Sequence, residues 1–148
     1  MSRELWLLRH GKSDRDVIVN DFDRPLKKRG IKAAQRVGMW MNQMALIPDV
    51  IISSPAERAM ATTKIVCKAI AFREDHIQQN LGLYGDGYES IKSILKEIPQ
   101  KNKKILLVGH NPELEDLLIH LAGKPNIPDV KKLIPTAAFV RLIMPTDR

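Results

Sequence analysis

The sequence predicts an α/β fold of three layers (α/β/α), in which a mostly parallel central sheet lies between two layers of helices. Three short runs, at residues 5–8, 50–52 and 105–108, are apolar at every position. Such runs are typical of central strands that are buried on both faces of a covered sheet. Helical patterns separate the runs, and strands that alternate with helices form βαβ units with parallel strands. The length of 148 residues predicts a single domain, residues 1–148, with its own core.

Two long helices are expected, one on each side of the second apolar run. The first covers about residues 27–44, where apolar residues recur at spacings of three and four. The second begins with a capping box, because Ser54 can act as the N-cap and Glu57 stands three residues later. Pro55 then occupies the first helical position, where proline is favoured.

The remaining elements are shorter. A weak strand is expected at 78–81 and a helix from about 87 to 98. A further helix is expected to be capped by Asn111, to begin at Pro112 and to end near 121. A strand at about 138–143 follows it.

Composition and charge limit the classes of function. Lys and Arg number 24 against 17 Asp and Glu, and the net charge of +7 suits anionic ligands. A nucleic-acid-binding module is the alternative from another class, but aromatic residues make up 5% and no basic stripe with interleaved aromatic residues occurs. The run at 5–8 is too short for a signal peptide or a membrane span, so a cytoplasmic protein without a membrane partner is expected.

No metal or cofactor site is expected. None of the histidines, which are His10, His76, His110 and His120, is paired at the spacing of a His-x-x-x-His site, and Cys67 is the lone cysteine. The phosphate-binding pattern Gly-x-x-x-x-Gly-Lys-Ser/Thr does not occur either.

Polar residues with phosphate chemistry follow each of the three apolar runs. Arg9 and His10 follow the first run, Arg58 lies one turn into the helix after the second, and His110 follows the third. The carboxyl ends of parallel strands meet at one edge of a sheet, where ligands bind. Adjacent parallel strands would therefore bring these four residues into one crevice.

The four side chains suit transfer of a phosphoryl group. Guanidinium groups bind phosphate oxygens through a planar fork of donors. A neutral imidazole nitrogen, here that of His10, can attack phosphorus and form a phosphohistidine, which divides one displacement into two. The nearby arginines should lower the pKa of His10 and so favour its neutral form. His110 can bind the phosphoryl group as a hydrogen-bond donor, and its charge stays open.

Three motifs in this order resemble the histidine phosphatase superfamily, whose fold is phosphoglycerate mutase-like. Arg9-His10-Gly11 resembles its Arg-His-Gly signature, the segment 53–59 resembles its Ser-Pro-x-x-Arg-Ala segment, and Gly109-His110 resembles the segment of its second histidine. The resemblance implies that His10 is the phosphorylated nucleophile. It also implies that Arg9, Arg58 and His110 complete the phosphate pocket.

A further segment is similar to the SixA-type phosphohistidine phosphatases. Residues 21–26 read Asp-Phe-Asp-Arg-Pro-Leu and match the Asp-x-x-Arg-Pro-Leu of that group. This likeness implies that Asp21 and Arg24 line the mouth of the site and bind substrate. The alternative is that they anchor the loop, with Arg24 paired to Asp21 or Asp23.

One part of the superfamily pattern is missing. Many relatives carry a carboxylate after the third strand as general acid, but the matching residues 81–85 include no acid. An alkoxide leaving group needs a proton, whereas an imidazole already protonated on its other nitrogen needs much less help. The gap favours phosphohistidine on a protein as substrate. The alternative is a small phosphorylated metabolite, with Asp21, Asp86 or Glu89 as the acid.

Overall fold

The computed structural model describes residues 2–128 and 132–145, so the first residue and the last three of the predicted domain lie outside the described residues. Five strands form one sheet in the order β3-β2-β4-β1-β5. They are β1 (Ser2–Arg9), β2 (Val50–Ser53), β3 (Gln78–Gln79), β4 (Lys104–Gly109) and β5 (Phe139–Pro145). The four α-helices are α1 (Lys28–Gln43), α2 (Glu57–Ile70), α3 (Gly87–Lys96) and α4 (Glu113–Ala122). The predicted α/β class with a mostly parallel sheet is confirmed.

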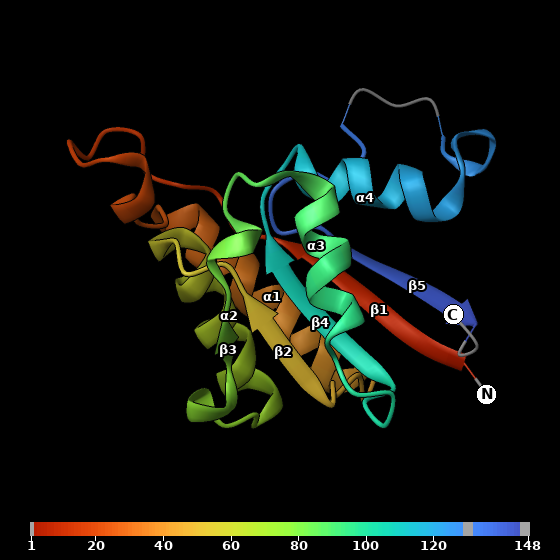
Figure 1. The fold of residues 1–148 in the computed structure, drawn as a ribbon. Coiled ribbons are helices and arrows are strands. Elements are labelled where there is room, and N and C mark those ends of the chain that lie inside the picture. The colour runs from red at the N-terminus through yellow and green to blue at the C-terminus, as the bar shows by residue number, and fades with distance from the viewer. Residues whose placement is uncertain (1, 129–131, 146–148) are drawn as a thin grey trace.

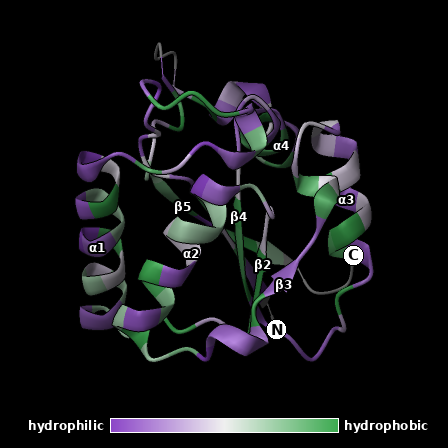
Figure 2. Ribbon diagram, turned by 90° about the vertical axis from the view of Figure 1, so that its left-hand side faces the viewer, coloured by the Kyte–Doolittle hydropathy of each residue, from purple (hydrophilic) through white to green (hydrophobic). Residues whose placement is uncertain are grey.

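The sheet has helices on both faces. Figure 2 shows α1 and α2 on one side of the strands and α3 and α4 on the other. Alternate side chains of each strand point to opposite faces, so Leu5 and Leu7 join the core under α3 and α4 while Trp6 and Leu8 join the core under α1 and α2. Because both faces are buried, the strands need apolar residues at every position.

Four of the five described strands run in the same direction. β4 pairs in parallel with β1 on one side and with β2 on the other, and β2 pairs in parallel with the short β3. The arrowheads of β1, β2 and β4 point toward one end of the sheet (Figure 1). β5 pairs with β1 in the antiparallel sense. The parallel arrangement gathers the loops after β1, β2 and β4 at the same edge, where the sequence places the candidate site.

Both helix-capping predictions are wrong. α2 begins at Glu57 with Ala56 as its N-cap, and no side chain caps it. The Ser54 hydroxyl lies 2.8 Å from a ring nitrogen of His110 instead. α4 begins at Glu113, and the Asn111 amide donates to the Ile134 carbonyl at 2.7 Å. In both cases the short polar side chain before the helix has a partner elsewhere in the fold. The Ser54 hydroxyl also accepts from the Ala56 N–H at 3.3 Å, but among the described residues neither side chain makes the capping bond to its helix.

The edge strands differ from their predicted lengths. β3 has two residues, and the chain enters a short 3-10 turn at Leu81–Leu83 where the prediction continues the strand. β5 is longer than predicted and follows β1 along seven pairs of residues. Among the helices in the described part of the chain, none has the length and apolar character needed to cross a membrane.

Candidate active site

The two histidines follow strands that lie next to each other. Arg9 at the end of β1 is paired with Gly109 at the end of β4, so His10 and His110 leave the sheet side by side. Their ring centroids are 5.0 Å apart. The backbone N–H of His10 donates to the Gly109 carbonyl at 3.2 Å, which keeps the two loops together beyond the sheet.

The His10 ring is held in one tautomer. Its Nδ1 lies 2.7 Å from the Gly11 carbonyl oxygen, which can only accept, so Nδ1 carries the proton. The lone pair is therefore on Nε2. The Nε–H of Arg58 faces that nitrogen at 3.4 Å. His10 thus presents an unprotonated nitrogen beside a guanidinium group, as a nucleophile toward phosphorus requires.

His10 is neutral at physiological pH. The ring is 7% exposed, and burial is the main cause that lowers the pKa of His10 from 6.5 to about 4. The Gly11 hydrogen bond opposes the shift, while the charges of Arg58 and Arg9 add to it. The predicted direction is confirmed. The main cause differs from the predicted one, because loss of hydration acts on the buried ring more strongly than the arginines do.

The glycine after His10 allows a close approach to α1. The Gly11 N–H donates to the Thr62 hydroxyl of α2 at 3.0 Å. A Cβ atom at Gly11 would lie 2.7 Å from the Gly30 carbonyl oxygen, closer than carbon and oxygen can approach without a shift. Gly11 therefore lets the loop after β1 lie directly on the start of α1.

Arg58 connects His10 to the loop at 21–26. Its Nη1 donates to the Asp21 backbone carbonyl at 2.6 Å, and its Nη2 lies 3.0 Å from the Asp21 carboxylate. The Arg58 side chain is 10% exposed, against 54% for Asp21. Asp21 thus orients the guanidinium group from the solvent side while the Nε–H points to His10.

Asp21 has two further partners. The Tyr84 hydroxyl donates to its carboxylate at 2.6 Å, and an Arg24 nitrogen lies 3.6 Å from it. The Tyr84 hydrogen bond, followed by that of Arg58, lowers the pKa of the Asp21 carboxyl. Asp21 is therefore both in the site and an anchor of the loop. Arg24 pairs with Asp21, as the loop-anchoring alternative expects.

His110 is fixed by Ser54 from the loop after β2. Its Nε2 lies 2.8 Å from the Ser54 hydroxyl, and its Nδ1 is buried with no hydrogen-bond partner among the described residues. Burial, followed by the neighbouring His10 and Arg58, lowers the pKa of His110 to about 3. Burial therefore favours the neutral form of the His110 ring.

Arg9 is held from the segment before β5. Its Nη1 donates to the Ile134 carbonyl at 3.1 Å, while its Nε is buried and has no partner in the described part of the chain. The Ile134 N–H donates to the Glu115 carboxylate at 2.7 Å, and Asn111 bonds both Glu115 and the Ile134 carbonyl. This network fixes the Arg9 side chain beside the end of β1.

A cavity of about 530 Å³ adjoins His110 and Arg58, whereas His10 and Arg9 are not among the residues that line it. The side chains that line it include Asp21, Arg58, Tyr84, His110, Glu113 and Asp116. Arg24, Asp86 and Glu89 are not among the residues that line it. Within the described residues, no group of three or more His, Cys, Asp or Glu side chains could hold a metal ion.

Several residues of the site were not predicted from the sequence. Ser54 was interpreted as a helix cap, and Tyr84 and Glu113 were not considered. Their positions in the chain gave no strong signal, because each reaches the site through the packing of its element. For Tyr84 the sequence offered one indication, because this tyrosine lies in residues 81–85, where many relatives carry an acid.

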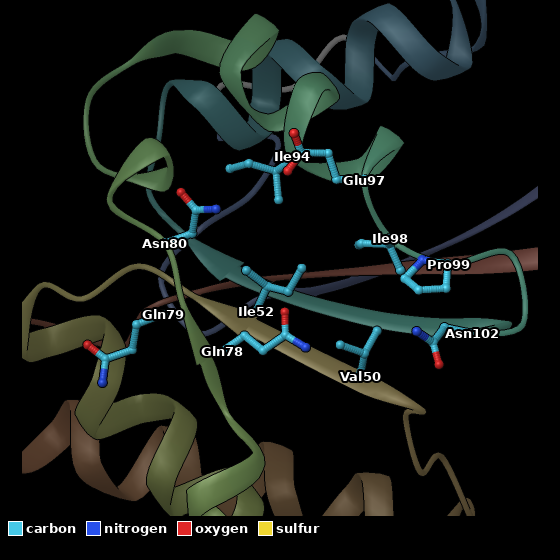
Figure 3. A pocket seen from close by; sticks show the side chains of 10 residues that line it. All are labelled: Val50, Ile52, Gln78, Gln79, Asn80, Ile94, Glu97, Ile98, Pro99 and Asn102. Atoms are coloured by element: carbon cyan, nitrogen blue, oxygen red, sulfur yellow. The ribbon is translucent and has the colours of Figure 1, made fainter.

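A second, smaller cavity lies away from these residues. It has a volume of about 180 Å³ and adjoins β2, β3 and the end of α3 (Figure 3). Gln78, Asn80 and Asn102 supply amide groups to it, and Glu97 supplies a carboxylate. No Lys, Arg or His lines it, so it lacks the charge that a phosphate group needs.

Residues 5–83 match the sequence profile of the histidine phosphatase superfamily, branch 1. The chain belongs to this superfamily. An uncharacterised chloroplastic protein of Arabidopsis thaliana is 30% identical over 132 residues, which are 83% of this chain and 61% of that protein. A 2,3-bisphosphoglycerate-dependent phosphoglycerate mutase of Clavibacter michiganensis is 35% identical over 114 residues, 75% of this chain and 43% of the mutase. The chain thus spans less than two thirds of the length of both relatives.

Solved structures share the whole fold. The crystal structure of a protein assigned as the phosphohistidine phosphatase SixA of Agrobacterium tumefaciens has a TM-score of 0.88 at 25% identity and covers 99% of this chain and 94% of its own. A protein histidine phosphatase SixA complexed with tungstate has a TM-score of 0.81 at 17% identity, covering 97% of each chain. The predicted phosphoglycerate mutase-like fold is confirmed.

Proposed function

We propose that this enzyme removes the phosphoryl group from phosphohistidine on a protein, through a covalent intermediate on His10. The observation that carries the proposal is the tautomer of His10. The Gly11 carbonyl holds the proton on Nδ1, and the Nε2 lone pair faces the site beside Arg58. The likeness to the SixA proteins supports the choice of substrate.

The reaction takes place in two displacements. In the first, the Nε2 lone pair of His10 attacks phosphorus, and the bond from phosphorus to the substrate's imidazole nitrogen breaks with its electron pair on that nitrogen. Arg9, Arg58 and His110 would bind the phosphoryl oxygens and stabilise their charge. In the second, a water oxygen attacks phosphorus, inorganic phosphate leaves, and Nε2 recovers its lone pair.

The carboxylates that the sequence left open as general acids are poorly placed for that role. Asp21 accepts hydrogen bonds from Tyr84 and Arg58, which lower its pKa and keep it ionised. Asp86 and Glu89 do not line the cavity. An ionised Asp21 cannot give a proton to an alkoxide, so this environment favours a leaving group that departs without one, such as a protonated imidazole.

The test uses a purified phosphohistidine-containing protein as substrate. The wild type should release inorganic phosphate, and a brief reaction should leave an acid-labile phosphoryl group on His10. His10→Ala should abolish both, since no other described histidine takes its place. His76→Ala, which changes an exposed histidine outside the site, is the matched control. Phosphate release at an undiminished rate by His10→Ala would overturn the proposal.

A small phosphorylated metabolite is the second candidate. The observation that favours it is the 35% identity to a phosphoglycerate mutase, together with the carboxylates of Glu113 and Asp116 in the cavity. A panel of phosphate esters distinguishes the two. Turnover of one ester well above that of phosphohistidine would favour this candidate.

A further inference from the structure

Glu113 is a buried carboxylate in the cavity that adjoins His110. It is the first residue of α4 and stands three residues after His110. Its exposed fraction is 7%, and the residue lines the cavity together with Arg58, Tyr84 and His110. Few carboxylates are buried to this extent unless they are paired.

Glu113 has no partner of its own among the residues that the structure describes. Its Oε1 atom is buried without a hydrogen bond, and no Lys, Arg or His of the described chain forms an ion pair with it. The other buried acceptor close to the site, the Asn111 side-chain oxygen, is neutral. A carboxylate that has lost its water and gained no donor costs free energy, and a ligand that supplies a donor recovers that cost.

The position of the cavity indicates which part of a ligand would reach Glu113. In a phosphoryl transfer the attacking and leaving atoms lie roughly in line on opposite sides of phosphorus. With His10 as the attacking group, the leaving group lies on the side of phosphorus that faces away from His10. The open space next to the His10 ring is the cavity that His110, whose ring is 5.0 Å away, lines together with Glu113. A leaving group in this cavity can therefore reach Glu113.

We propose that the Glu113 carboxylate accepts a hydrogen bond from the N–H of the leaving imidazole ring, at the ring nitrogen that does not carry phosphorus. This inference rests on the proposed function and names the residue that selects the phosphorylated imidazole. A phosphorylated imidazole with that second nitrogen protonated carries a positive charge on its ring. The buried carboxylate stabilises this cation. The alcohol part of a phosphate ester carries no such positive charge, so it does not gain this stabilisation.

The proton count explains why this contact favours reaction. When the phosphorus–nitrogen bond breaks, its electron pair stays on the ring nitrogen, and the proton on the other nitrogen makes the departing ring a neutral imidazole. No proton has to be transferred to the leaving atom during the step. Glu113 thus acts by holding the substrate in its protonated form and in line with Nε2 of His10.

The experiment compares two substrates on one variant. The probes are free phosphohistidine, phosphorylated on the ring, and p-nitrophenyl phosphate, which has no N–H on its leaving group. Glu113→Gln keeps the size of the side chain and removes its charge. We expect kcat/KM for phosphohistidine to fall by about 10- to 100-fold, the effect of losing a hydrogen bond to a charged group. The value for p-nitrophenyl phosphate should change by less than about threefold.

The ratio of the two kcat/KM values is the readout, because a loss of folded protein lowers both values equally. Glu57→Gln is the matched control, since Glu57 is the first residue of α2, is exposed and does not line the cavity. An unchanged ratio in Glu113→Gln, with phosphohistidine still hydrolysed, would overturn the inference and leave the proposed function intact. A larger loss on the ester would instead assign Glu113 as a general acid. A wild type that hydrolyses only the ester would overturn the proposed function itself.

Discussion

The floor of the active site and its rim differ in what holds their side chains in place. On the floor, His10 and His110 are buried, and hydrogen bonds to Gly11 and Ser54 orient their rings. On the rim, the Asp21 side chain is 54% exposed and is held by two charged partners and a tyrosine. Arg58 reaches from the buried part to the rim.

The floor is rigid because it continues the sheet. His10 and His110 follow directly on the paired ends of β1 and β4, and the backbone bond between them extends that pairing. The rim rests on the loop at 14–26 and on ion pairs of the half-exposed Asp21. Solvent weakens such pairs, and fully exposed ones are worth about 0–1 kcal/mol each. Because of this difference, we expect substitutions on the floor to alter the rate of the chemical step and substitutions on the rim to alter substrate binding.

The largest effect among these changes is expected from Arg58, which belongs to both regions. Arg58→Ala removes the donor beside Nε2 of His10 and the partner of Asp21, so kcat should fall by about 10²–10³-fold, as for loss of one transition-state donor. Steady-state kinetics with p-nitrophenyl phosphate measures it. Arg36→Ala, on the exposed face of α1, is the control. A fall of less than tenfold would show that the floor works without the side chain that links it to the rim.

Acid should affect the floor before it affects the rim. The folded histidines have pKa values of about 4 for His10 and about 3 for His110, below the ordinary 6.5. Between pH 6.5 and about 4 the unfolded chain therefore binds protons that the folded chain does not, so the free energy of unfolding rises with pH in this window, by at most about 1.4 kcal/mol per pH unit for each histidine. Urea unfolding at several pH values measures the slope.

The same measurement on His10→Asn isolates one histidine. Between pH 4 and 6.5, the free energy of unfolding of this variant should rise less steeply with pH than that of the wild type. The reason is that one of the two neutral rings is gone. An equal slope would mean that His10 does not contribute to the acid sensitivity and that the floor is more accessible to protons than its burial indicates.

A smaller effect is expected when the floor loses only the group that orients His110. Ser54→Ala removes the hydroxyl 2.8 Å from Nε2 of His110. A neutral hydrogen bond contributes about 1 kcal/mol, so kcat/KM should fall by about fivefold to tenfold, mainly through kcat. Ser93→Ala changes an exposed serine on α3 and serves as the control. A change in KM alone would show that Ser54 acts in substrate binding, as the residues of the rim are expected to do.

The smallest effect is expected on the rim. Tyr84→Phe removes the hydroxyl that donates to Asp21 at 2.6 Å but keeps the ring against His110. The Arg58–Asp21 pair is still present, so KM should rise by no more than about fivefold and kcat should stay close to wild type. Tyr88→Phe provides the comparison. A fall in kcat as large as that of Ser54→Ala would remove the distinction between floor and rim.

Much of the fold could be predicted from the sequence, because the central strands are buried on both faces. The runs at 5–8, 50–52 and 105–108 each became the interior of a strand, and the pattern at 27–44 became α1. The predictions were poorer at the edges. β3 buries neither of its residues, so its sequence holds little apolar signal, and the antiparallel direction of β5 leaves no mark in its composition.

The helix caps show a second limit. Ser54 and Asn111 stand where capping residues usually stand, and a local rule assigns them to the helix ends. In the folded chain their side chains bond to His110 and to the Ile134 carbonyl, groups that are far away in sequence. Local preference is worth about 1 kcal/mol, so a partner brought close by packing can override it.

The sequence alone was enough to name His10, Arg9, Arg58 and His110 as one group, because parallel strands place everything that follows them at the same edge of the sheet. It could not show which nitrogen of His10 carries the proton, that burial more than charge keeps both rings neutral, or that Glu113 lies in the cavity without a partner among the residues that the structure describes. Those features depend on distances between residues from different elements. Such distances arise only when the helices and loops pack around the sheet.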